Sequence, residues 1–213
     1  MRIASVTYRL VVFDFDGTLA DSFPWFATVL DEAADRFGFR RVDAAEREAL
    51  RASGSREILR RFGVPVWKLP MIAAHMRRLK SEAADRIPLF EGTGEMLRRL
   101  SEKGVQLGIV SSDAEENVRR TLGPDHAARI RHYECGASLF GKHARLRQVL
   151  RRSGVLPRQA IYVGDEIRDA EAARAAGIAF GAVSWGYARP EALKAQEPAE
   201  FFACMEAIAH RMG

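Results

Sequence analysis

Residues 10–22 read LVVFDFDGTLADS, so four apolar residues run directly into two aspartates and a glycine. An apolar run of this length, half of it β-branched, is typical of a strand that is covered on both faces of a sheet. The strand should end where the charge begins, which places Asp14 at its carboxyl end. In an open α/β sheet, ligands bind at that edge, so the segment predicts a site there.

Asp14 and Asp16 would place two negative charges beside an apolar core. This arrangement is costly without a cation, and Mg²⁺ prefers such hard carboxylate oxygens. With Mg²⁺ bound, Asp14 can attack a phosphorus atom as a nucleophile, and Asp16 can carry a proton to the leaving oxygen. The alternative interpretation is an ordinary polar turn after a strand, which suits a lone Asp-x-Asp better than Asp-x-Asp-Gly-Thr.

Residues 13–22 resemble the first motif of the haloacid dehalogenase superfamily, and the Gly-Thr-Leu continuation resembles its phosphatase branch. The resemblance implies phosphomonoester hydrolysis through an aspartyl-phosphate intermediate, in the phosphoglycolate phosphatase-like group. It implies that Asp14 is the nucleophile and a metal ligand. It further implies that Asp16 is the general acid/base and lends its backbone carbonyl to the metal, while Thr18 orients Asp16.

The chain has 213 residues, 47% of them hydrophobic and 29% charged, which suffices for one domain with an insertion or for two small domains. Residues 22–88 carry Arg, Ala and Glu at helical spacing, which predicts an inserted α-helical cap. Alternating helical and strand patterns follow, so residues 1–21 and 89–213 should form an α/β core with a doubly wound parallel (Rossmann-like) sheet. The predicted helices cover 93–103, 115–122, 144–153 and 170–176, and the predicted strands 105–110, 131–135, 160–163 and 178–183.

Residues 105–113, VQLGIVSSD, form a second apolar strand that ends in polar residues. The hydroxyl of Ser111 and the backbone N–H groups that follow, from Ser112 onward, can bind phosphate oxygens. A serine after a strand is also a common helix cap. Resemblance to the second motif of the superfamily favours the phosphate role, although Ser112 and Asp113 depart from the Thr-Asn-Lys of many phosphoglycolate phosphatases.

Lys142 stands at the start of a predicted helix, where a cation is unfavourable for the helix dipole. An anionic partner such as an aspartyl phosphate would explain it, and a solvated lysine is the alternative. The superfamily places a phosphate-binding lysine on this helix, so the resemblance implies that role for Lys142. The proline that usually follows this lysine is replaced here by His143.

Residues 161–173, IYVGDEIRDAEAA, repeat the pattern of the first motif. A buried strand presents Asp165 at its carboxyl end, beside the first strand in the usual winding, so Asp14 and Asp165 should converge on one Mg²⁺. Asp169 has two interpretations: it supports Lys142 or a metal-bound water, or it only favours the start of its helix. Glu166 and Arg168 are expected to be solvated, although Glu166 is close enough to the site to remain a candidate.

The chain carries a net charge of +5, and residues 22–88 hold thirteen Lys or Arg against nine Asp or Glu. A basic cap suits a small anionic phosphorylated metabolite as substrate. The glycine-centred break at residues 52–57 predicts a loop through which Ser55 and Arg56 contact the substrate. Arg56 could pair with a carboxylate or a second phosphate, and a solvated arginine is the alternative.

Several other functions remain open to the sequence. Within the superfamily, they are a phosphatase for another small phosphate ester or pyrophosphate, and a phosphosugar mutase. A nucleic-acid-binding regulator would suit the basic charge but lacks a recognition motif, and a response-regulator receiver would need no inserted cap. Two cysteines and no apolar run of roughly 20 residues predict a soluble cytoplasmic protein that does not enter a membrane.

Overall fold

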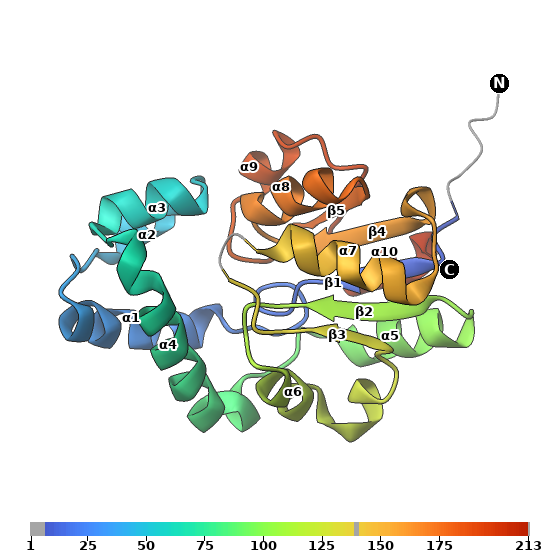
Figure 1. The fold of residues 1–213 in the computed structure, drawn as a ribbon, viewed down its shortest axis with the longest axis horizontal. Helices are drawn as coiled ribbons and strands as arrows, with labels where there is room; N and C mark the ends of the chain where they lie inside the picture. Colours follow the sequence, from blue (N-terminus) through green and yellow to red (C-terminus); the bar gives the residue numbers. More distant parts are fainter. Residues whose placement is uncertain (1–6, 139–140, 213) are drawn as a thin grey trace.

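In the part of the chain that the structure describes, the sheet has six strands, all parallel, in the order β3-β2-β1-β4-β5-β6 (Figure 1). A computed structural model describes residues 7–138 and 141–212. The order reverses direction at β1, which confirms the predicted doubly wound α/β sheet. The strands are β1 (Leu10–Phe13), β2 (Gln106–Val110), β3 (His132–Glu134), β4 (Ala160–Gly164), β5 (Ala179–Val183) and β6 (Glu200–Phe202).

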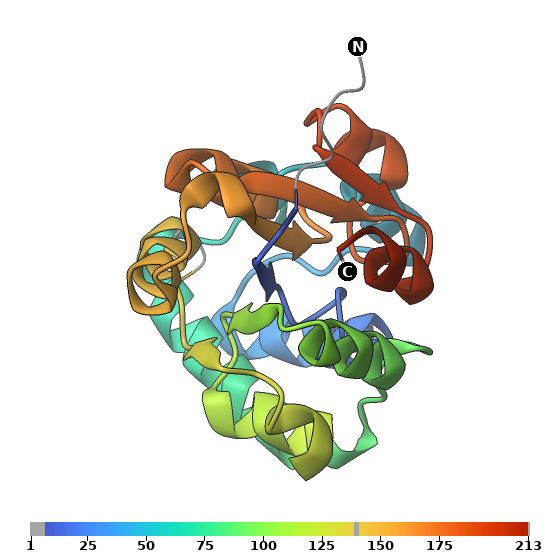
Figure 2. The ribbon, with the colours of Figure 1, turned by 90° about the vertical axis from the view of Figure 1, so that its right-hand side faces the viewer.

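Helices cover both faces of the sheet (Figure 2). Side chains alternate along β1, so Val11 and Phe13 pack into one apolar cluster while Leu10 and Val12 pack into another. The first cluster includes residues of α5 (Thr93–Glu102), α6 (Glu115–Ala127) and α10 (Met205–Arg211). The second includes residues of α7 (Lys142–Ser153), α8 (Ile167–Ala176) and α9 (Pro190–Lys194).

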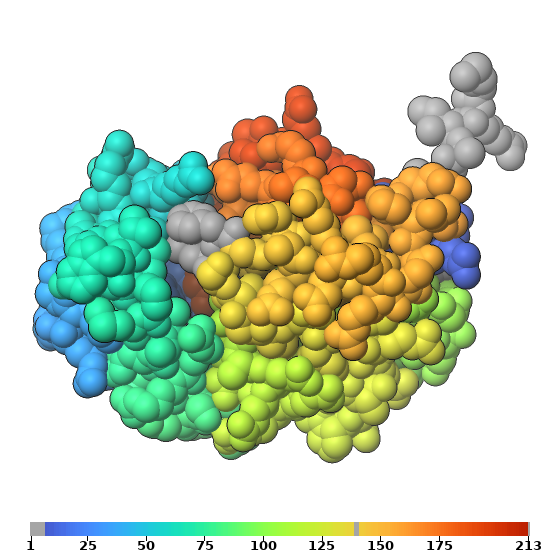
Figure 3. All heavy atoms as spheres, in the orientation of Figure 1, coloured from blue at the N-terminus to red at the C-terminus, as the bar shows by residue number. Residues whose placement is uncertain are grey.

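A helical lobe lies beyond the carboxyl ends of the strands (Figure 1), and the surface is hollowed where the lobe meets the core (Figure 3). It contains α1 (Phe23–Phe37), α2 (Ala44–Leu50), α3 (Ser55–Phe62) and α4 (Leu69–Ala83). Its own apolar cluster comprises Leu30, Val42, Leu50 and Phe62. The chain leaves and re-enters the core at adjacent points, where the Asp21 N–H donates to the Pro88 carbonyl at 2.9 Å. We propose residues 22–88 as a cap on this basis.

Element boundaries differ from the predicted ones where side chains alter the local backbone. Helix α8 begins three residues before the prediction, because Glu166 and Asp169 form a capping box at its amino end. Helix α6 continues beyond the predicted stop as a second short helical piece after a kink at Gly123. Strand β6 and helices α9 and α10 were not predicted. No helix in the described part of the chain is long and apolar enough to cross a membrane.

Candidate active site

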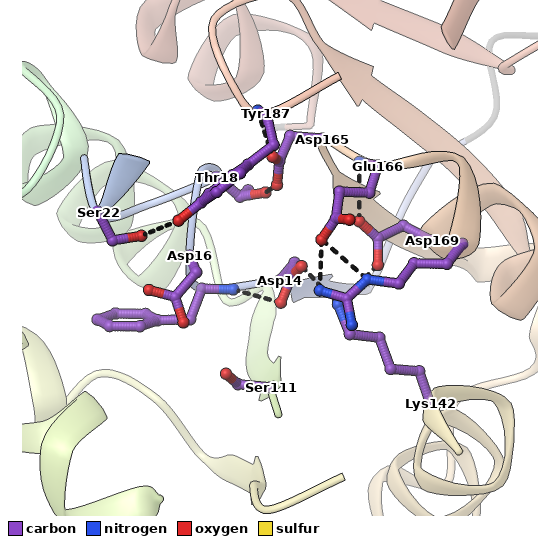
Figure 4. Close-up of polar contacts among 12 residues, drawn as sticks. Asp14, Asp16, Thr18, Ser22, Ser111, Lys142, Asp165, Glu166, Asp169 and Tyr187 are labelled. Atoms are coloured by element: carbon purple, nitrogen blue, oxygen red, sulfur yellow. Dashed lines mark hydrogen bonds and ion pairs between the residues drawn. The ribbon is translucent and has the colours of Figure 1, made fainter. Parts of the chain in front are cut away.

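Three neighbouring strands bring the polar segments of the sequence to one edge of the sheet. In the register of β1, Phe13 pairs with Ile109 of β2 and with Val163 of β4. The residues that follow these strands, among them Asp14 and Asp165, are therefore level with one another. The structure thus brings together the segments in which site residues were predicted (Figure 4).

The turn after β1 requires a glycine for two reasons. Gly17 has a φ of +77°, in the left-handed region that L side chains rarely adopt. A Cβ atom at Gly17 would also lie 2.2 Å from Oδ2 of Asp165. The Gly-Thr of the first motif therefore allows its turn to pass directly over the carboxylate that follows β4.

Lys142 joins two of the buried carboxylates. Its Nζ donates to Oδ2 of Asp14 at 2.5 Å and to Oδ1 of Asp169 at 2.7 Å, and all three residues are at most 2% exposed. Burial raises the pKa of Asp14 to about 7 even though Lys142 opposes this change. Asp169 differs, because Lys142 and Arg168 outweigh its burial and hold the pKa of Asp169 below its ordinary value.

Asp169 also stabilises the start of α8. Its Oδ2 accepts a hydrogen bond from the Glu166 N–H at 3.0 Å, and its Oδ1 accepts one from the Tyr162 hydroxyl at 3.2 Å. The two interpretations of Asp169 are therefore compatible, since one oxygen caps the helix while the other holds Lys142. The predicted link between Asp169 and Lys142 is present in the structure.

Asp165 is completely buried and is held by groups from two other segments. Thr18 Oγ1 donates to its Oδ1 at 2.6 Å, and the Tyr187 N–H donates to its Oδ2 at 2.7 Å. Thr18 therefore contacts Asp165 in this structure, whereas the resemblance implied that it orients Asp16. Burial, together with the charges of Asp14 and Glu166, raises the pKa of Asp165 well above its ordinary value.

A group of acidic side chains fits a cation. Asp14, Glu166 and Asp169 each offer an oxygen atom, and these atoms lie within 4.8 Å of one another. Burial raises the pKa of both Asp14 and Asp165, so negative charge on these carboxylates is costly here and a bound cation would stabilise it. Carboxylate oxygens in excess of nearby cations are a donor set that suits Mg²⁺. The side chains of Asp16 and Asp165 do not belong to this geometric group.

Asp16 is paired with a lysine of the helical lobe that the sequence did not indicate. Lys80 of α4 is 3% exposed, and its ammonium group contacts the carboxylate of Asp16 and, at 2.8 Å, Oδ2 of Asp113. Burial would raise the pKa of Asp16, but Lys80 holds the pKa of Asp16 below its ordinary value. The thirteen basic residues of the predicted cap were visible in the sequence, but nothing in their spacing distinguishes Lys80.

The two serines after β2 have different environments. Ser111 is buried beside Asp14 and Asp16 (Figure 4), and its Oγ accepts a hydrogen bond from the Asp113 N–H at 3.0 Å. Ser112 is partly exposed, and it lines the cavity between the lobe and the core. Ser111 therefore lies beside Asp14, whereas Ser112 lies at the wall of the cavity, and a phosphate-binding role for both stays a prediction.

The two residues predicted to contact the substrate from the cap, Ser55 and Arg56, also have different environments. Ser55, the first residue of α3, lines the same cavity. Arg56 is exposed and is not among the described residues that line it. Two aromatic residues of the carboxyl-terminal segment, by contrast, reach the first motif. Trp185 Nε1 donates to the Thr18 carbonyl at 3.1 Å, and the Tyr187 hydroxyl lies 3.0 Å from Ser22 Oγ.

Fold and site together define an α/β protein with an aspartate-rich site at the sheet edge, under a helical lobe. A sequence model of the haloacid dehalogenase-like hydrolases matches residues 11–183. The chain belongs to this family.

Known relatives extend the comparison over most of the chain. Phosphoglycolate phosphatase from Synechococcus elongatus is 33% identical over 191 residues, which cover 89% of this chain and 90% of that protein. Tyrosine-protein kinase PtkA from Mycobacterium tuberculosis is 30% identical over 189 residues, which cover 86% of this chain and 64% of that protein. A crystal structure from Lactobacillus plantarum, of a protein proposed to be a phosphoglycolate phosphatase, has a TM-score of 0.81 at 24% identity and covers 96% of this chain and 99% of that one. This structure shares the fold.

Proposed function

We propose that this protein is a Mg²⁺-dependent phosphomonoesterase that acts through a phosphoryl group on Asp14. The observation that carries the proposal is a buried carboxylate at the end of β1, held by Lys142 and surrounded by further carboxylates. Its family and its Synechococcus relative support phosphatase activity. 2-Phosphoglycolate is the substrate that the relative's name suggests, and it is one of the compounds with which the proposal is tested. The proposal also places the protein in the cytoplasm.

The reaction would take place in two steps. An oxygen of Asp14 attacks the phosphorus atom, the bond to the leaving oxygen breaks, and that oxygen takes a proton from Asp16. A water molecule, which loses a proton to Asp16, then attacks the phosphorus and releases phosphate from Asp14. Lys142 and the groups at Ser111 and Ser112 would stabilise the phosphoryl oxygens. Mg²⁺, when bound, would offset the charge that the carboxylates and the phosphate bring together.

Asp16 would have to change its protonation state during this cycle. Paired with Lys80, it is held as a carboxylate, which is the form that takes a proton from water in the second step. In the first step it must carry a proton, and the contact with Lys80 opposes that form. Because Lys80 belongs to the lobe and Asp16 to the core, we propose that movement of the lobe changes this contact during the cycle.

Two sets of Mg²⁺ ligands are proposed. Both include Asp14, and they differ in the other ligands. The family resemblance favours Asp165 with the backbone carbonyl of Asp16, whereas the geometry groups Asp14 with Glu166 and Asp169. Asp165→Asn and Glu166→Gln separate these sets, since only a ligand's substitution should weaken Mg²⁺ affinity strongly. Calorimetric titration with Mg²⁺ measures this affinity directly.

The function is tested by turnover of p-nitrophenyl phosphate, 2-phosphoglycolate and other phosphorylated metabolites, with Mg²⁺ and with excess chelator. We expect activity only with Mg²⁺, and we expect Asp14→Asn to lower it to background while the protein stays folded. Mass spectrometry of the acid-quenched enzyme should find phosphate on the peptide that contains Asp14. Full activity in chelator, or turnover by Asp14→Asn within about tenfold of wild type, would contradict the mechanism.

A further inference from the structure

A cavity of about 720 Å³ lies between the helical lobe and the carboxyl edge of the sheet. It extends from Asp16 and Asp113 into the interior of the lobe. Pockets that bury drug-sized ligands measure roughly 300–1,000 Å³, so this cavity belongs to that class. A two-carbon ester such as 2-phosphoglycolate would fill only a small part of it.

The wall of this cavity is mainly apolar. Helix α4 contributes a stripe at helical spacing, in which Leu69, Ile72 and Met76 lead along one face to Lys80. The same stripe therefore forms part of the apolar wall and ends in the ammonium group that contacts Asp16. Apolar side chains from the rest of the lobe complete the wall, among them Phe23, Phe26, Leu50, Ile58 and Phe62.

Most cationic side chains along the cavity have partners within the protein, but Nη1 of Arg168, which also lines it, is buried without a hydrogen-bond partner among the described residues. Arg47, Arg51 and Arg77 each donate to a backbone carbonyl, at 3.2, 2.8 and 3.4 Å respectively. Lys80 is held between two carboxylates. An apolar group of the substrate gains by leaving water against the apolar part of this wall, and it does so without displacing any of these contacts.

We propose that the substrate is a phosphomonoester of a bulky apolar or aromatic alcohol, whose organic part fills this cavity while its phosphate lies at Asp14. This inference rests on the proposed phosphatase function and gives it a substrate class. The continuity of the cavity with Asp16 supports it, because the proton donor for the leaving oxygen stands where the organic part begins.

The test compares ethyl phosphate with 2-phenylethyl phosphate, which have similar primary alkoxide leaving groups and differ in apolar bulk. We expect kcat/KM to be higher for 2-phenylethyl phosphate by roughly ten- to hundredfold. Met76→Asp, which places a charge in the apolar wall, should reduce this ratio about tenfold. Met71→Asp is the matched control, because Met71 is 48% exposed on the same helix and is not among the described lining residues.

The possible results distinguish a failure of this substrate inference from a failure of the proposed phosphatase function. Equal kcat/KM for both esters, or a preference for 2-phosphoglycolate over 2-phenylethyl phosphate, would overturn the inference and leave the phosphatase function intact. No hydrolysis of either ester or of p-nitrophenyl phosphate would overturn the function. In that case, calorimetry with 2-phenylethylphosphonate and ethylphosphonate still tests the cavity, and equal affinities would overturn the inference as well.

Discussion

At the scale of single residues, two buried lysines hold the two aspartates of the first motif. Lys142, from the core, holds Asp14, and Lys80, from the lobe, holds Asp16. Burial alone would lower the pKa of each lysine, but the carboxylates that face them outweigh it and raise both values. Both lysines therefore remain charged, and each can influence the protonation of the carboxylate that it contacts.

Lys80→Met should raise the pKa of Asp16, because Lys80 is what holds that pKa below its ordinary value. The limb of the pH–kcat/KM profile that reports Asp16 should then move to higher pH. kcat/KM at neutral pH should rise by up to roughly tenfold, because the protonated form that gives its proton to the leaving oxygen becomes more populated. Lys80→Arg should restore part of the profile. Arg78→Met, on the exposed face of the same helix, serves as the control, and a Lys80→Met profile identical to wild type would exclude this role.

At the scale of an element, the amino end of α8 combines helix capping with the site. Because Asp169 caps the helix with one oxygen and holds Lys142 with the other, a single substitution affects both stability and chemistry. The capping box explains why the helix begins at Ile167. The start of the helix in turn fixes the position of Asp169, where its carboxylate contacts Lys142. The position of one carboxylate thus depends on where a helix starts.

Two substitutions of Asp169 separate these contributions. Asp169→Asn keeps an oxygen acceptor for the Glu166 N–H but removes the charge that faces Lys142. We expect it to lose most turnover at little cost in stability. Asp169→Ala removes both, and its free energy of unfolding should fall by about a further 1 kcal/mol. Urea denaturation and steady-state kinetics measure the two effects, and full activity in Asp169→Asn would show that capping is its whole role.

At the scale of the whole molecule, the fold concentrates negative charge at one edge of a sheet, and this links stability to pH and to Mg²⁺. Asp14 has a pKa of about 7 in the folded protein, above the value of roughly 3.9 for an exposed aspartate. The folded state therefore binds this proton more tightly, and the contribution of Asp14 to the free energy of unfolding decreases as pH rises from about 4 to 7. Asp165, whose pKa is also raised, acts in the same direction.

In chelator, the Tm of the wild type should decrease relative to that of Asp14→Asn between pH 5.5 and 8. Mg²⁺ at about a hundred times its dissociation constant should raise the wild-type Tm at pH 8 by roughly 5–10 °C. The increase should be smaller at pH 5.5, where protonation of Asp14 competes with the metal. Thermal melts followed by circular dichroism test this, and a Tm at pH 8 that does not respond to Mg²⁺ would contradict the proposed metal site.

Strong local patterns in the sequence determined the core of this fold. Short apolar runs that end in polar residues predicted β1, β2 and β4 and placed Asp14 and Asp165 at one edge, because parallel strands bring their carboxyl ends together. Strand β6 has only three residues, too few to show a period, and unlike the equally short β3 it does not stand between two predicted helices, so it was not predicted.

Only the tertiary structure decided which side chains meet. The contact between Lys80 and Asp16 joins residues 64 positions apart, and the lobe must pack on the core to form it. The same packing creates the apolar cavity, and it leaves Arg56 exposed, for which the sequence had offered both a substrate contact and a solvated arginine. Backbone periodicity is local and can be read along the chain, whereas the partners of long charged side chains depend on how separate elements pack, and that information lies in no single segment.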